Sequence, residues 1–177
     1  MNGTVIKKKL QGILSNTLNN YDVDVKINED LTYKVIVIEN FKFKPNTPRN
    51  SDYTFQIDLL ITDKNAYNLP LVAIKISNDP STDHILTYSE KALKHKEIYP
   101  YLRYGLIIGG RDDIPNRFFT HNKGFDFAYV LDDINNNNSI TGLATMITQQ
   151  IDSARSLLYI LKNENQIKEF NTIVEIK

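Results

Sequence analysis

Two apolar stretches decide the fold: Phe55-Gln56-Ile57-Asp58-Leu59-Leu60-Ile61 and Leu69-Pro70-Leu71-Val72-Ala73-Ile74-Lys75-Ile76-Ser77. The first belongs to a predicted strand over residues 53–62. The second is so uniformly apolar that we expect a strand buried on both faces. The residues between them, 63–68, predict a turn. The two strands are therefore expected at the centre of a sheet.

The chain upstream of this centre predicts a helix and two strands. Residues 21–27 and 31–43 alternate apolar and polar side chains, with a turn at 28–30, and predict two antiparallel strands. Residues 44–50 hold two prolines without periodicity and predict a loop. The first helix is indicated by apolar residues at helical spacing: Val5, Ile6, Leu10, Ile13, Leu14 and Leu18.

The chain downstream predicts a helix followed by two more strands. Asp79-Pro80-Ser81 supplies capping residues, and Pro100 ends the helix. Residues 102–108 and 124–131 read as strands. The helix carries one apolar stripe: Ile85, Tyr88, Ala92, His95 and Tyr99. This order predicts an α/β domain of three layers, in which a central mixed sheet has helices on its faces.

A long C-terminal helix is predicted over about residues 140–162. Its apolar seam alternates steps of three and four: Ile140, Leu143, Ile147, Ile151, Ala154, Leu158 and Leu161. Such a seam packs on the sheet or pairs with a second copy to form a homodimer. Packing in the core is the favoured interpretation.

Composition places limits on the whole chain. At 177 residues it is expected to form one domain, with a core over about residues 5–131. There are 21 Lys and Arg against 21 Asp and Glu, so any basic surface must be local. Cysteine is absent, and the longest apolar runs are too short for a membrane helix. We expect a soluble cytoplasmic protein without a membrane partner.

The two central strands each contain one charge, Asp58 and Lys75. A buried carboxylate or ammonium costs several kcal/mol unless it is paired or bound to a metal. The two side chains are therefore expected to meet. Two interpretations are open: a structural ion pair, or half of a Mg²⁺ site.

The order of helix, strands, Asp58 strand, Lys75 strand, helix and strand resembles the PD-(D/E)xK nuclease superfamily, with its restriction endonuclease-like fold. The resemblance covers roughly residues 5–131. It implies that Asp58 is a ligand of Mg²⁺, or of Mn²⁺ in its place, and that a lysine activates water and stabilises the phosphorane charge.

The second half of the family motif is altered. Side chains two apart on a strand share a face, so Ala73/Lys75 and Lys75/Ser77 are both candidates for the acid and lysine pair. The first register lacks the acid, and the second places Lys75 at the acid and Ser77 at the lysine. Asp58, Lys75 and Ser77 are thus the candidate catalytic residues. The missing metal ligand is expected from elsewhere, with candidates Glu39, Asp79 and Glu90.

The helix after the second strand is the candidate nucleic-acid surface. His84, Tyr88, Lys91 and His95 share roughly one face, and Lys94 lies nearby. Tyr88, Lys91 and Lys94 are predicted to contact phosphates, and aromatic side chains in the region to stack on bases. The opposing interpretation is that Tyr88 packs and Lys91 is solvated. The spacing of His84 and His95 does not suit a helical zinc site.

Two functions follow from the sequence. The first is a Mg²⁺-dependent endonuclease that hydrolyses DNA, with Asp58 as ligand and Lys75 at the scissile phosphate. The second is a catalytically inactive member of the same fold that binds nucleic acid or assembles with partners. In the second, Asp58 and Lys75 form a buried ion pair.

Overall fold

The computed structural model describes residues 3–34, 36–38, 42–44, 53–163, 167–171 and 174–176. Five strands form a mixed sheet in the order β1-β4-β5-β6-β7. They are β1 (Val23–Thr32), β4 (Thr54–Asp63), β5 (Leu69–Asn78), β6 (Arg103–Gly109) and β7 (Phe127–Val130). β1, β4 and β5 are antiparallel neighbours, whereas β5, β6 and β7 run parallel. The predicted central mixed sheet is confirmed.

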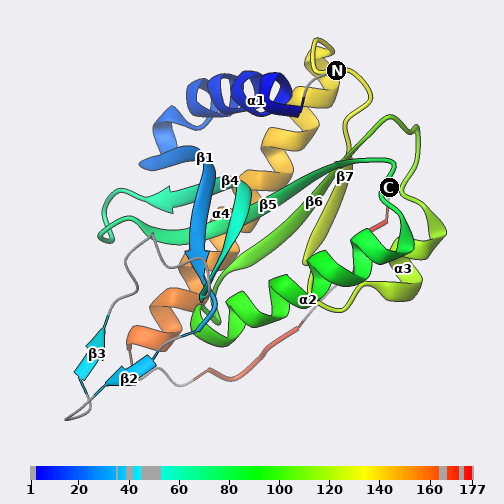
Figure 1. Cartoon of the computed structure of the whole chain (residues 1–177). Coiled ribbons are helices and arrows are strands. Elements are labelled where there is room, and N and C mark those ends of the chain that lie inside the picture. The colour runs from blue at the N-terminus through cyan, green and yellow to red at the C-terminus, as the bar shows by residue number, and fades with distance from the viewer. Residues whose placement is uncertain are drawn as a thin grey trace.

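Helices cover both faces of this sheet (Figure 1). α1 (Gly3–Thr17) and α4 (Asn137–Lys162) pack on one face, where Leu10, Leu14, Leu143 and Ile147 join a buried core. α2 (Thr82–Ile98) and α3 (Asn116–His121) lie on the other face. Their core includes Ile85, Ala92 and Phe118. The three-layer α/β architecture predicted from the sequence is therefore present.

The N-terminal strand differs from the prediction. β1 does not reverse direction at residues 28–30, because it pairs with β4 on both sides of Asn28: from Val23 opposite Asp63 to Ile27 opposite Leu59, and from Glu29 opposite Ile57 to Thr32 opposite Thr54. Asn28 accommodates this path with a φ of 54°. The segment predicted as the second strand, residues 31–43, instead contributes β2 (Ile36–Ile38) and β3 (Lys42–Lys44), which form a separate two-stranded sheet. A short 3-10 helix, η1 (Asn19–Tyr21), precedes β1.

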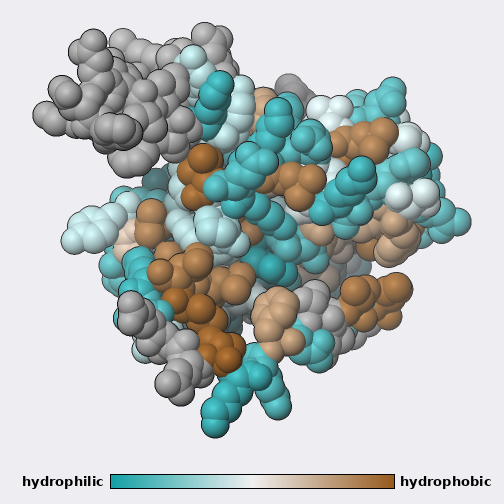
Figure 2. Space-filling model, turned by 90° about the horizontal axis from the view of Figure 1, so that it is seen from below, coloured by the Kyte–Doolittle hydropathy of each residue, from teal (hydrophilic) through white to brown (hydrophobic). Residues whose placement is uncertain are grey.

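The seam of α4 packs on the sheet, as the favoured interpretation predicted. Leu143, Ile147, Ile151, Ala154 and Leu158 are buried in the core shared with α1. The homodimer prediction can then use only exposed side chains of this helix, and it stays a prediction. The last turn of α4 lies at the lower left of Figure 1. Figure 2, seen from below, shows hydrophobic side chains gathered beside hydrophilic ones. Exposed apolar residues of that turn are Tyr159, Ile160 and Leu161.

No helix in the described part of the chain combines the length and apolar character needed to cross a membrane.

Candidate functional site

Asp58 lies where the two central strands stop pairing. The paired positions of β4 and β5 end at Leu59 opposite Ile74. One residue further on, the Asp58 Oδ2 atom accepts a hydrogen bond of 2.9 Å from the backbone N–H of Ile76. Asp58 is 5% exposed, so this acid is embedded in the sheet and partly replaces the backbone ladder.

Two ammonium groups contact the carboxylate of Asp58. Lys7 of α1 places its Nζ 2.5 Å from Oδ1, and Lys75 of β5 places its Nζ 3.0 Å from Oδ2. Lys7 also donates to the Oδ1 atom of Asn28, and Lys75 to the carbonyl oxygen of Gln56. Each lysine is therefore fixed by more than one acceptor, and both carboxylate oxygens already have cationic partners.

These contacts shift the proton affinities of both groups. Burial by itself raises the pKa of Asp58, but the bonds from Lys7 and the Ile76 N–H, together with Lys75, outweigh burial and hold that pKa below its usual 3.8. Burial lowers the pKa of Lys75 from its usual 10.5, against the opposing effect of Asp58. The pKa of Lys75 is lowered further by the like charges of Lys7 and Lys91. The cluster is thus an ionised carboxylate with an excess of cations.

This donor set does not fit Mg²⁺. That ion takes oxygen ligands, usually with one or two protein carboxylates. Among the described residues no group of three or more His, Asp or Glu side chains is placed to hold a metal ion. The motif position Ala73 is fully buried in the core under α2.

The other proposed ligands have separate positions. Glu90 is an exposed residue of α2, and Glu39 lies outside the described residues. Ser77 is partly buried near the end of β5, two residues beyond Lys75. Of the proposed catalytic set, only Asp58 and Lys75 have a recorded contact with one another.

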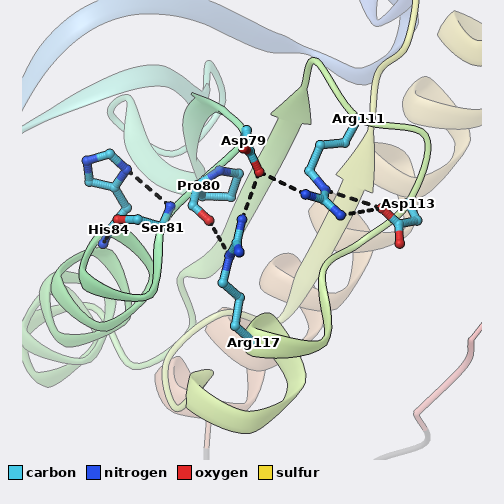
Figure 3. A network of polar contacts seen from close by, with 7 residues as sticks. All are labelled: Asp79, Pro80, Ser81, His84, Arg111, Asp113 and Arg117. Carbon is cyan, nitrogen blue, oxygen red and sulfur yellow. Dashed lines mark hydrogen bonds and ion pairs between the residues drawn. The ribbon is translucent and has the colours of Figure 1, made fainter.

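Asp79, the third suggested ligand, belongs to a second polar network (Figure 3). Its Oδ1 atom accepts from Arg111 at 2.9 Å and from Arg117 at 2.7 Å. Arg117 also donates to the Pro80 carbonyl, and Arg111 to Asp113. The network fastens the loop after β6 and the start of α3 to the turn between β5 and α2. Its aspartates neutralise its arginines, so we interpret it as structural.

The face of α2 combines lysines with aromatic rings. Lys75 lies 5.3 Å from the centroid of the Tyr88 ring, which also stacks on His84. The Nζ of Lys91 lies 4.9 Å from the centroid of Phe55, and that of Lys94 lies 5.7 Å from the centroid of Tyr33. Tyr88 and Lys91 therefore border the Asp58 cluster through Lys75. Tyr88 packs against the core of this face, as the opposing interpretation expected, and Lys91 is half-buried.

His95, grouped with this face in the sequence, is instead fully buried. Its Nε2 atom lies 3.0 Å from the Leu31 carbonyl oxygen, and its ring packs between Phe55 and Tyr104. Desolvation lowers its pKa from 6.5 to about 4, so the neutral ring that donates to Leu31 is the stable form. His95 is a core residue and not part of the site.

Lys7 is the site residue that sequence reasoning missed. It is one of three consecutive lysines in an amphipathic helix, and nothing in the periodicity distinguishes it from Lys8 or Lys9. Only the packing of α1 beside β1 and β4 brings its ammonium to Asp58.

Comparisons with known proteins do not assign the site: no protein-family model matches the chain, and no curated protein matches it.

Proposed function

We propose that this protein is a catalytically inactive member of the nuclease-like fold that binds nucleic acid through a metal-independent cationic site. One observation carries the proposal: both oxygens of the Asp58 carboxylate are bonded to ammonium groups, from Lys7 and Lys75. Oδ2 also accepts the N–H of Ile76, so three donors already occupy the two oxygens and a metal ion would have to compete with the ammonium groups for them. The positive charge beside Asp58 therefore comes from these two lysines and needs no metal ion.

The charge balance of the cluster favours an anionic ligand. One carboxylate is surrounded by Lys7, Lys75 and, further out, Lys91, whose field reaches Lys75. The surplus of positive charge is local, since the chain as a whole is neutral. A polyanion with closely spaced phosphates is the ligand class that gains most from such a patch, through release of its counterions. The absence of cysteine suits the cytoplasmic location that we propose with this function.

A Mg²⁺-dependent endonuclease is the second candidate. It is favoured by the order of the elements and by the direct contact of an acid on β4 with a lysine on β5. In that candidate a carboxylate from outside the described residues, such as Glu39, would complete the donor set. It requires Lys7 to leave Asp58 when metal binds.

One experiment separates the two candidates. Wild-type protein is titrated into fluorescent DNA and RNA, single-stranded and duplex, with either EDTA or Mg²⁺ and Mn²⁺, and is incubated with supercoiled plasmid. The proposal expects equal binding with EDTA and with metal, and intact plasmid.

Two variants complete this design. Lys7→Gln is expected to weaken binding several-fold, whereas the matched variant Lys8→Gln, on an exposed neighbour of the same helix, leaves binding unchanged. Metal-dependent nicking that disappears in Asp58→Asn would establish the nuclease instead. No binding to any nucleic acid would overturn both candidates.

A further inference from the structure

Two stacked aromatic rings, Phe55 on β4 and Tyr33 just after β1, lie beneath two lysines of α2. Tyr33 and Phe55 stack with their centroids 4.0 Å apart and their planes 9° apart. Lys91 lies over Phe55, and Lys94 over Tyr33. Because the stacked rings leave no room for an ammonium between them, the lysines occupy the outer faces of the pair. Each ring therefore has the other ring on one face and a lysine on the opposite face.

This arrangement argues against base stacking by these rings. A base needs a free aromatic face, and stacking on Tyr33 or Phe55 would have to displace a lysine or separate the pair. The same contacts restrict the lysine side chains in advance, so less conformational freedom is lost when these side chains bind a ligand. The rings thus position Lys91 and Lys94. Both lysines remain available to a ligand because they are only half-buried.

The held lysines continue the charge of the Asp58 cluster. Lys91 lies near enough to Lys75 to lower the pKa of that lysine. Lys75 in turn contacts both Asp58 and the ring of Tyr88. A series of ammonium groups on α1, β5 and α2 therefore runs from the carboxylate to the stacked ring pair: Lys7, Lys75, Lys91 and Lys94.

We infer that Lys91 and Lys94, fixed by Phe55 and Tyr33, bind the sugar-phosphate backbone of a nucleic acid without reading its bases. This rests on the proposed function and names the part of the ligand that the site recognises. An ammonium is a point charge that suits a phosphate oxygen and carries little base information by itself. Binding is then expected to depend on salt and to be nearly indifferent to sequence.

The test uses strands with and without bases. Fluorescence anisotropy measures binding of the wild type to a mixed-sequence single strand, to two homopolymers, and to an abasic strand of equal length, over a series of salt concentrations. We expect affinities within about threefold of one another, because phosphates dominate. The double variant Lys91→Gln/Lys94→Gln should lose at least about tenfold in affinity, and its salt slope should fall by about 1.4.

Ring variants test whether the aromatic pair positions the lysines. Phe55→Leu removes the surface beneath Lys91 and is expected to weaken binding to the abasic and the normal strand by the same factor, of about two to five. Phe119→Leu, at an exposed ring of α3 that contacts no lysine in the recorded pairs, is the matched control and should change neither. Thermal melting checks that each variant is folded.

The outcomes separate the inference from the proposed function. If normal strands bind and the abasic strand does not, bases are read and the inference is wrong, while the proposed function stands. If the abasic strand binds but the double lysine variant binds equally well, the phosphate contacts lie elsewhere and the inference is again wrong. If the wild type binds no strand, the proposed function fails and the inference fails with it.

Discussion

The Asp58 carboxylate on β4 lies 3.0 Å from the Lys75 ammonium on β5 and accepts the N–H of the next residue, Ile76. The pair therefore does two things at once. It neutralises two buried charges, and it joins the central strands where their backbone pairing has ended. Removing one partner leaves the other charge in a poorly solvated place.

Asp58→Asn should destabilise the fold by about 2–3 kcal/mol, because Lys7 and Lys75 would then be held together without a counter-charge. The estimate is below that for a fully buried pair because the side chains of Lys7 and Lys75 are 20% and 13% exposed. Urea denaturation followed by circular dichroism measures it.

Asp24→Asn is the matched control for this prediction. Its partner Lys64 lies 3.4 Å away, and the two side chains are 43% and 49% exposed. Solvent screens such a pair, so the change should stay within about 0.5 kcal/mol. Equal effects of the two variants would mean that the Asp58 cluster contributes no more than a surface ion pair.

Lys75→Glu should create a metal site beside Asp58. It places a second carboxylate beside Asp58, and the like charges should make the metal-free variant less stable than the wild type. Mn²⁺ at ten times its dissociation constant should restore about 1.4 kcal/mol, by binding only the folded state. Differential scanning fluorimetry with and without Mn²⁺ measures this.

Lys75→Gln removes the same ammonium without adding a carboxylate, and it should show no Mn²⁺ effect. A wild type that is stabilised by Mn²⁺ as strongly as Lys75→Glu would contradict the prediction, since Asp58 would then bind metal despite its lysines. Lys75→Glu tests the second register of the motif, in which position 75 is the acid position.

The sequence predicted the layers better than it predicted the site. The apolar runs around Asp58 and Lys75 can satisfy their burial only in a central sheet, so the pattern determines where they lie. The turn predicted at 28–30 was wrong: the polar residues Asn28, Glu29 and Asp30 suggest a turn, but only Asn28 leaves the extended conformation, and pairing with β4 resumes at Glu29. The local sequence alone cannot predict a pairing with a strand that lies further along the chain.

The contact between Asp58 and Lys75 could be predicted because two isolated charges in adjacent apolar strands must compensate each other. The contact of Lys7 with Asp58 could not be predicted, because it depends on how α1 packs on the sheet and not on any spacing along the chain. The burial of His95 could not be predicted either, because its position on α2 belongs to both the apolar stripe and the polar face.

Asp79→Asn should loosen the loop after β6 while leaving global stability nearly unchanged. The variant weakens the attraction of residue 79 for Arg111 and Arg117, which fasten that loop in Figure 3. Asparagine still tolerates the φ of 41° at this position, so backbone strain is not added. Hydrogen exchange should become faster for backbone amides in residues 111–118.

Asp112→Asn is the control for this measurement, because Asp112 is an exposed neighbour that has no recorded ion pair in the described network. It should leave exchange of the same amides unchanged. Unaltered exchange in Asp79→Asn would show that the network does not hold the loop.

His95 should give the fold a distinct dependence on pH. Its pKa is about 4 in the folded protein and 6.5 as the ordinary value, because burial disfavours the charged ring. Between these values the unfolded chain binds a proton that the folded chain does not, so stability falls as the pH drops from about 6.5 to about 4. The loss should be about 3 kcal/mol.

Asp58 does not produce this effect. Its pKa is already below 3.8 when folded, so the stability it contributes is lost only as the pH falls below that value. His95→Gln retains a donor for the Leu31 carbonyl but cannot titrate, and urea denaturation between pH 7 and pH 4 should show most of the slope removed. His84→Gln, at an exposed histidine of the same helix, should keep the wild-type slope. A slope that survives in His95→Gln would assign the effect to other groups and would mean that burial does not keep this ring neutral.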